Sequence, residues 1–257
     1  MSASSKNQRR EAARQRAEAL RAETARKEKR ARLIMIASTV VGLALLVVLI
    51  FVIVGQGSQS AFEDVEIKPQ NVEDGEVVFG DEDAAAELVV FSDYMCPHCG
   101  TFEDVNGDDL QELIDTDNVS ISYFPVAYLD GSSNGSKFST RSTNAAYCVA
   151  DGDKEMFPEF HAALFADQPE MKTPGFSNEE MAEIADGLGL NDDVQQCIID
   201  ETFEDYVTAA SQFAGSEHDV SGTPTAFLNG DDLSEDLDVR WDQPGELKDA
   251  ALAKANE

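Results

Sequence analysis

Two cysteines separated by two residues, Cys96 and Cys99, are the side chains in this sequence best suited to chemistry. They lie in the stretch SDYMCPHCGTF, residues 92–102. A pair with this spacing can bind a metal, cross-link a loop or exchange electrons with another thiol. These three uses need different surroundings, so the neighbouring elements decide between them.

The elements on either side of the pair predict a strand followed by a helix. The run ELVVF at 87–91 is typical of a β-strand and ends directly before the pair, and apolar residues recur at helical spacing through 99–114. A cysteine at the start of a helix lies near unpaired backbone N–H groups and the positive end of the helix dipole. Both favour a thiolate, so we expect Cys96 to be the attacking sulfur.

The two residues between the cysteines fit the same interpretation. Pro97 suits the first helical turn, where its missing N–H costs nothing. His98 adds a further donor or partial positive charge that would stabilise Cys96 as an anion. Cys99 lies one turn further in, and we expect it to resolve the mixed disulfide that Cys96 forms with a substrate.

At this point the sequence resembles the DsbA-like thiol-disulfide oxidoreductases of the thioredoxin superfamily. The resemblance covers roughly residues 76–257 and rests on the CPHC motif, on Phe102-Glu103, on a helical block at about 138–214, and on Gly222-Thr223-Pro224-Thr225 ahead of a strand. It implies an α/β fold, a thioredoxin-like sheet with flanking helices and an inserted helical domain. It also implies that Pro224 is cis and packs beside the pair, while Thr223 presents its backbone to substrate.

The resemblance further implies an enzyme whose substrates and partners are proteins. The expected activity introduces disulfides into exported, unfolded proteins, with no cofactor beyond the redox-active Cys96–Cys99 disulfide and no metal. The expected reoxidising partner is a quinone-linked membrane protein of the DsbB or VKOR type. Thr223 is also found before this proline in isomerases, so an isomerase or reductase is an alternative, and a non-catalytic holdase or adaptor is another.

The other two cysteines, Cys148 and Cys197, predict a structural disulfide. Each lies among apolar neighbours in a predicted helix, in AAYCVA and VQQCII. Closing a loop of about 50 residues would stabilise the fold by about 4 kcal/mol in the chain-entropy model. The alternatives are a second redox pair, or a zinc site made by all four cysteines, although the chain has no second CxxC.

Several polar and aromatic neighbours have open roles. Glu103 could tune the resolving cysteine or be solvated on its helix, and Asp93 carries the same ambiguity. His161 is expected to be a packing residue in a helix. Tyr94 and Met95 adjoin the attacking cysteine and could form an apolar rim for unfolded chains.

Charge divides the chain into two parts. Of the 19 Lys/Arg and 50 Asp/Glu, residues 1–32 hold 11 and four, a net charge of +7, which leaves eight and 46 for 33–257, a net charge of −38. Residues 33–54 form an uncharged, apolar run of 22 residues, about the thickness of a bilayer core. The positive-inside rule then predicts a single-pass cell-membrane protein with its N-terminus cytoplasmic and its catalytic domain extracytoplasmic.

The remaining elements follow from periodicity and from Gly, Pro and Asn-Asp signals. Residues 55–75 are predicted to be a tether. Further strands are expected at 76–79, 119–128, 224–229 and 238–241, and helices at 138–150, 155–167, 178–187, 191–214 and 244–254.

Overall fold

The computed structural model describes residues 61–257 except residue 82. The predicted tail at 1–32 and the predicted membrane span at 33–54 lie outside these residues. Within the described part of the chain, no helix is both long and apolar enough to cross a membrane.

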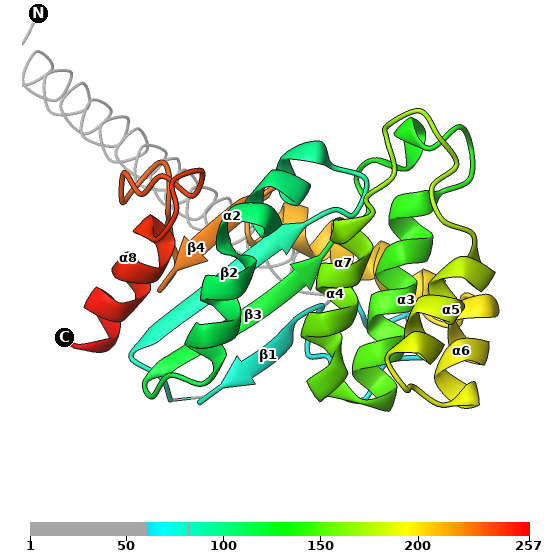
Figure 1. Ribbon diagram of the computed structural model, residues 1–257, viewed down its shortest axis with the longest axis horizontal. Coiled ribbons are helices and arrows are strands. Elements are labelled where there is room, and N and C mark those ends of the chain that lie inside the picture. The colour runs from blue at the N-terminus through cyan, green and yellow to red at the C-terminus, as the bar shows by residue number, and fades with distance from the viewer. Residues whose placement is uncertain (1–60, 82) are drawn as a thin grey trace, which may run out of the picture. The chain divides into compact units, whose positions relative to one another are not determined.

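A mixed five-stranded sheet forms the centre of the fold, in the order β1-β3-β2-β4-β5 (Figure 1). Its strands are β1 (Val77–Gly80), β2 (Ala86–Ser92), β3 (Val119–Pro125), β4 (Thr225–Leu228) and β5 (Asp231–Asp232). The pair β2 and β3 is parallel, and the other three pairs are antiparallel. Both central strands are almost entirely buried. In β3 the buried residues include Ser120 and Ser122, which alternate with its apolar side chains. This is the thioredoxin-like α/β sheet that the sequence predicts.

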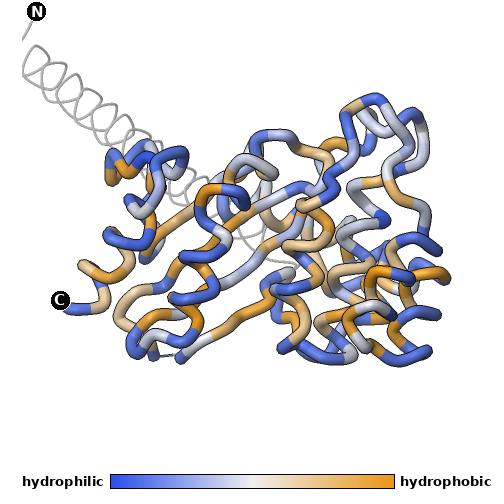
Figure 2. The backbone as a smooth tube through the Cα atoms, viewed as in Figure 1, coloured by the Kyte–Doolittle hydropathy of each residue, from blue (hydrophilic) through white to orange (hydrophobic). Residues whose placement is uncertain are grey.

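Helices cover both faces of the sheet. The crossover between β2 and β3 is α2 (Pro97–Ile114), which packs with the C-terminal helix α8 (Glu246–Ala255). On the opposite face, behind the sheet in Figure 1, lies α7 (Glu204–Glu217). Hydrophobic residues run along the strands and alternate with hydrophilic residues along the helices (Figure 2).

The helical insertion lies between β3 and β4. It contains η1 (Asp130–Ser132), α3 (Phe138–Gly152), η2 (Lys154–Met156), α4 (Phe157–Ala166), α5 (Asn178–Gly187), α6 (Asp192–Ile199) and α7. Its central helix is α3, which contacts each of the others and is buried along most of its length. The Asn-Asp signal for a helix start acts as expected, because Asn191 caps α6. The start of α5 is a capping box of Ser177 and Glu180, which was not among the predicted signals.

Two predicted elements differ from the structure. The helix expected at 191–214 is two helices, because the chain turns after Ile199 with Glu201 in a left-handed conformation (φ 52°). The strand expected at 238–241 is wrong. That segment instead packs on α2, where the Trp241 ring lies 5.8 Å from Phe102 and its carbonyl accepts a hydrogen bond from Asn106 Nδ2 at 2.9 Å.

The folded domain begins before residue 76. Phe62 and Val72, both in the range predicted to be a tether, are buried. The Phe62 ring packs against Tyr206 and Phe213 of α7, with centroid separations of 4.8 and 5.4 Å. The tether prediction missed this because isolated apolar residues without periodicity carry no local signal.

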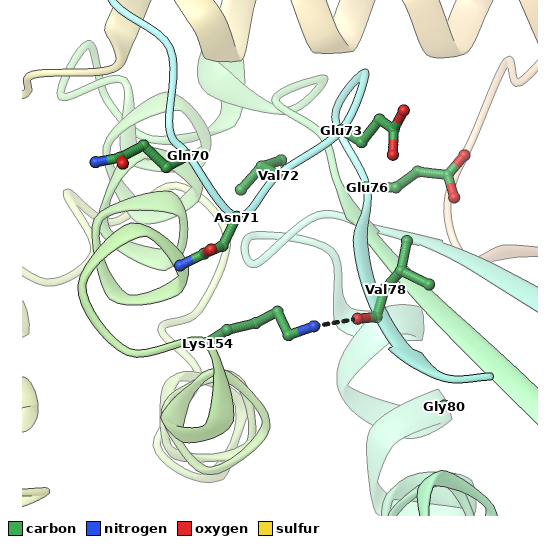
Figure 3. A pocket seen from close by; sticks show the side chains of 8 residues that line it. All are labelled: Gln70, Asn71, Val72, Glu73, Glu76, Val78, Gly80 and Lys154. Atoms are coloured by element: carbon green, nitrogen blue, oxygen red, sulfur yellow. Dashed lines mark hydrogen bonds between the residues drawn. The ribbon is translucent and has the colours of Figure 1, made fainter. Parts of the chain in front are cut away.

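One of the two edges of the sheet is β1, and a lysine side chain bonds to its backbone. Lys154 Nζ donates a hydrogen bond to the Val78 carbonyl at 2.9 Å, across a cavity of about 430 Å³ (Figure 3). An unpaired strand edge is a template for association with other strands, and a lysine at the edge opposes such pairing.

Candidate active site

Cys96 lies in the short turn between β2 and α2, directly before the first residue of the helix. It is the N-cap residue of the helix, with extended backbone (φ −84°, ψ 116°), and Pro97 begins the first turn. The Cys96 N–H donates to the Asp93 carbonyl at 2.9 Å, which forms the tight turn between strand and helix. The sulfur therefore lies at the end of the helix where backbone N–H groups have no helical partner.

The two cysteines are free thiols with different exposure and opposite pKa shifts. Cys96 is 5% exposed and Cys99 is 1% exposed. The pKa of Cys96 is lowered to about 5, chiefly by a hydrogen bond from the Cys99 thiol, with further help from Thr223 and from the backbone N–H groups of Cys99 and His98, while burial opposes the shift. Burial raises the pKa of Cys99 well above its usual range, and the neighbouring Cys96 adds to that rise.

The opposite pKa shifts give the two cysteines different roles, Cys96 as the nucleophile and Cys99 as the protonated resolving thiol. At neutral pH Cys96 is a thiolate, the reactive form in thiol–disulfide exchange. Cys99 keeps its proton, and its sulfur accepts a hydrogen bond from the Asp93 N–H at 3.4 Å.

Thr223 lies directly beside the attacking sulfur, although it is far from it in sequence. The Thr223–Pro224 bond is cis. Cys96 Sγ, as a thiol, donates to the Thr223 carbonyl at 3.3 Å. The sheet produces this proximity, because β4 begins at Thr225 and pairs with β2, which leads into the cysteine pair.

Four residues near the pair have surroundings that the sequence did not specify. Pro97 and His98 are exposed, and His98 lowers the Cys96 pKa through its backbone N–H. Tyr94 and Met95 are fully buried, so the expectation that they form an exposed apolar rim is wrong. They follow a buried strand directly, and the turn carries them into the core.

A groove of about 580 Å³ opens beside Cys96. One wall is the segment after β3, and the other is formed by α7 and the residues leading to the cis proline. Apart from the Cys96 thiolate, none of its lining side chains carries a charge, although the chain outside the predicted tail is strongly acidic. The lining residues are Cys96, Tyr128, Leu129, Ser211, Gln212, Gly215, Val220, Ser221, Gly222 and Thr223.

Gln168 of the helical insertion bonds to the backbone of residues 94–96, the redox loop that carries the attacking cysteine, and sequence reasoning missed it. Its Nε2 donates to the carbonyls of Tyr94 at 3.0 Å and Cys96 at 2.8 Å. Its Oε1 lies over Gly100, where a Cβ atom would come within 2.4 Å. No local pattern marks a residue 72 positions away from its partner, so only the tertiary structure reveals this contact.

The carboxyl group of Asp93 supports the same loop from within the core. It is fully buried, and burial raises its pKa to about 6 against the opposing effect of its hydrogen-bond donors. An acidic residue two positions after the buried apolar run at 88–91 was the available signal, since a buried carboxylate needs several partners.

A second buried polar network lies behind the cysteine pair. His161, 3% exposed, bonds through Nδ1 to the Tyr94 hydroxyl at 2.8 Å, and its Nε2 lies 3.5 Å from a Glu103 carboxylate oxygen. Burial raises the pKa of Tyr94 well above its usual range. His161 therefore does more than pack, and Glu103, with a side chain 15% exposed, faces this network rather than open solvent.

Cys148 and Cys197 lie apart from the active site, as a disulfide that joins α3 to α6 with a Cα separation of 5.8 Å. The four cysteines consequently do not converge on one site. Among residues 61–81 and 83–257, no group of three or more His, Cys, Asp or Glu side chains is placed to hold a metal ion.

Comparison with known proteins relates this arrangement to one family. A thioredoxin family model matches residues 72–242. The structure of DsbA from Mycobacterium tuberculosis in its reduced form is 30% identical, with a TM-score of 0.55, and the match covers 70% of this chain and 99% of that one. Disulfide bond formation protein D of Bacillus subtilis is 26% identical over 160 residues, which is 60% of this chain and 68% of that protein.

A further relative shares only part of its length with this chain. The serine/threonine-protein kinase PknE of M. tuberculosis is 28% identical over 162 residues. The match covers 62% of this chain but only 28% of the kinase.

Proposed function

Because the chain belongs to the thioredoxin family and is a DsbA-like protein thiol-disulfide oxidoreductase, we propose that it is an oxidase that introduces disulfide bonds into exported proteins. The observation that carries this proposal is the Cys96 pKa of about 5. Thiols at the same position have pKa values of about 7 in thioredoxin, a reductant, and about 3.5 in DsbA, a strong oxidant. A stabilised Cys96 thiolate favours the reduced form of the protein, so the oxidised form readily transfers its Cys96–Cys99 disulfide to a substrate.

The reaction follows from the two thiol environments. A substrate thiolate attacks Cys96 Sγ of the oxidised pair, forms a mixed disulfide and releases Cys99, which takes up a proton. A second substrate thiolate then attacks the substrate sulfur, and Cys96 departs as a thiolate. The substrate is oxidised by two electrons, and the Cys96–Cys99 disulfide is reduced. A leaving thiol of low pKa departs faster, so the Cys96 environment promotes the second step.

Thr223 can hold the substrate during this exchange. In the thiol form of Cys96 its carbonyl accepts the Sγ hydrogen. Once Cys96 is in a mixed disulfide that hydrogen is gone, and the carbonyl can accept an N–H from an extended substrate chain lying in the adjacent groove.

Equilibration of the Cys96–Cys99 couple with glutathione tests the direction of the reaction. We expect a potential well above that of thioredoxin, which is about −270 mV, and closer to those of disulfide isomerase and DsbA, about −180 and −120 mV. A potential near −270 mV would contradict the oxidase proposal and indicate a reductase. Incubation of a Cys99→Ser variant in cells should trap mixed disulfides with exported proteins, which a non-catalytic holdase would not form.

We also propose that the domain works outside the cytoplasm, tethered by residues 33–54, with no cofactor besides its own disulfide. The basic charge of residues 1–32 and the uncharged run that follows support this topology. The reoxidising partner would be a quinone-linked membrane protein of the DsbB or VKOR type. Protease added to intact spheroplasts should remove the domain and leave a small anchored fragment, whereas a protected domain would overturn the topology.

A further inference from the structure

The carboxyl group of Asp93 joins three separate segments of the fold. One oxygen, Oδ1, accepts hydrogen bonds from the Met95 N–H at 2.8 Å and from the Ser139 hydroxyl of α3 at 2.7 Å. The other, Oδ2, accepts from the Tyr128 N–H at 2.8 Å and the Leu129 N–H at 2.9 Å. All four partners donate, so the ionised carboxylate satisfies every one of them.

These four bonds connect the reacting sulfur with one wall of the groove. Met95 is the residue before Cys96, so Oδ1 fixes the loop that carries the nucleophile. Tyr128 and Leu129 line the groove beside Cys96, so Oδ2 fixes that wall from inside the protein.

The wall is also tied to the far side of the groove. The Tyr128 hydroxyl lies 3.2 Å from the Ser211 carbonyl and 3.1 Å from the Val220 carbonyl, and both of those residues line the opposite wall. Tyr128 thus connects the two walls of the groove, held by Asp93 at its backbone and by α7 and the following loop at its hydroxyl. Without Asp93, the Tyr128 and Leu129 N–H groups would lose their acceptor, and the segment would be held by the Tyr128 hydroxyl on the α7 side and by its flanking residues Val126 and Asp130.

We propose that Asp93 is a positioning residue for protein substrates, which sets the distance between Cys96 and the wall against which the chain flanking a substrate cysteine lies. The proposal rests on the exchange reaction at Cys96, but it holds whether the protein oxidises or reduces its substrates. A small thiol reaches Cys96 without occupying the groove. A peptide must place its cysteine at Cys96 and its flanking residues against the groove wall at the same time. Loss of Asp93 should therefore affect peptides selectively.

A comparison of two variants exploits the chemistry of the four donors. In Asp93→Asn the amide offers one acceptor and one donor group. The Ser139 hydroxyl can rotate and accept from the amide, but the Met95, Tyr128 and Leu129 N–H groups can only donate. The orientation with the amide oxygen toward Tyr128 and Leu129 keeps two of these bonds and loses the one from Met95. The amide oxygen will therefore face the groove wall, and its bonds to that wall persist. In Asp93→Ala all four bonds are lost.

The measurement is the ratio of two exchange rates of the oxidised protein, one with a reduced ten-residue peptide carrying a central cysteine and one with 2-mercaptoethanol. We expect Asp93→Ala to lower this ratio by about fivefold or more, as the loss of two well-formed hydrogen bonds at the wall would give. Asp93→Asn should stay within about twofold of the wild type on the same reasoning.

Asn144→Ala is the matched control. Asn144 is also fully buried, and its Oδ1 accepts a backbone hydrogen bond from Phe203 at 2.7 Å within the helical insertion, but it does not line the groove. It should lower the thermal unfolding temperature and leave the ratio unchanged. An unchanged ratio in Asp93→Ala, or an equal fall in both rates, would make Asp93 purely structural and overturn the proposal. The glutathione equilibrium reports separately on the oxidase assignment.

Discussion

Cys96 lies where a strand ends and a helix begins, whereas Cys148 lies within the last turns of a helix that is buried along most of its length. Around Cys96 the partners are polar: the Cys99 thiol, Thr223 and backbone N–H groups. Cys148 is 1% exposed within the apolar core of the insertion, and its sulfur is bonded to Cys197. One residue type therefore serves exchange in one region and cross-linking in the other, and the available hydrogen-bond donors and access make the difference.

The largest expected effect separates the two pairs by activity. Cys96→Ser should reduce peptide exchange to the background rate, because a serine hydroxyl is neither a thiolate nor able to form a disulfide. The double variant Cys148→Ala/Cys197→Ala should retain exchange, since neither residue contacts the groove. Loss of activity in the double variant, measured on folded protein, would mean that the second pair takes part in electron transfer.

The second effect separates the pairs by stability. The Cys148–Cys197 bond closes a loop across a sequence separation of 49. Its removal should lower the free energy of unfolding by about 4 kcal/mol in the chain-entropy model. Urea unfolding of the oxidised proteins measures this, and reduction of Cys96–Cys99 alone serves as the comparison. A loss below about 1 kcal/mol would contradict a stapling role.

The third effect is a pH dependence that belongs to the redox pair alone. The folded Cys96 pKa of about 5 lies below the ordinary 9.0. This thiolate therefore stabilises the reduced protein above pH 9, and the contribution is lost as the pH falls toward 5. Between pH 8 and 6 the reduced protein should lose up to about 3 kcal/mol relative to the oxidised one, the limit for one proton.

The oxidised protein is the control for this pH dependence, because its cysteines do not titrate while all other groups are shared. Urea unfolding of both forms at each pH gives the difference directly. If the difference stayed constant across this range, Cys96 would have an ordinary pKa, and the basis of the oxidase proposal would be lost.

The smallest effect tests the connection between the two regions. Gln168→Ala removes two hydrogen bonds from the insertion to the redox loop and should destabilise the protein by about 1–2 kcal/mol. Exchange should slow only modestly, because Asp93 still anchors the loop. Gly100→Ala should reproduce this change, since the added methyl group displaces Gln168 from its position. Gln168→Glu cannot donate to the Tyr94 and Cys96 carbonyls, so it should not rescue stability.

Local patterns in the sequence determined much of this protein. The apolar run before CPHC and the helical spacing after it predict the strand-to-helix junction at Cys96. Proline at the first turn and the Ser177 and Asn191 caps mark the starts of three helices. Such signals are legible because strand and helix patterns involve residues only a few positions apart.

The tertiary structure decided which distant groups meet. Thr223 reaches Cys96 across 127 residues, Gln168 reaches it across 72, and Asp93 meets α3 across 46. The expected strand at 238–241 and the single helix at 191–214 failed for the same reason, since packing on α2 and α3 overrode the local pattern. Periodicity shows which face of an element is buried, but it does not identify the partner on the other side. That partner depends on how the insertion packs against the sheet, and the packing sets the chemistry of Cys96.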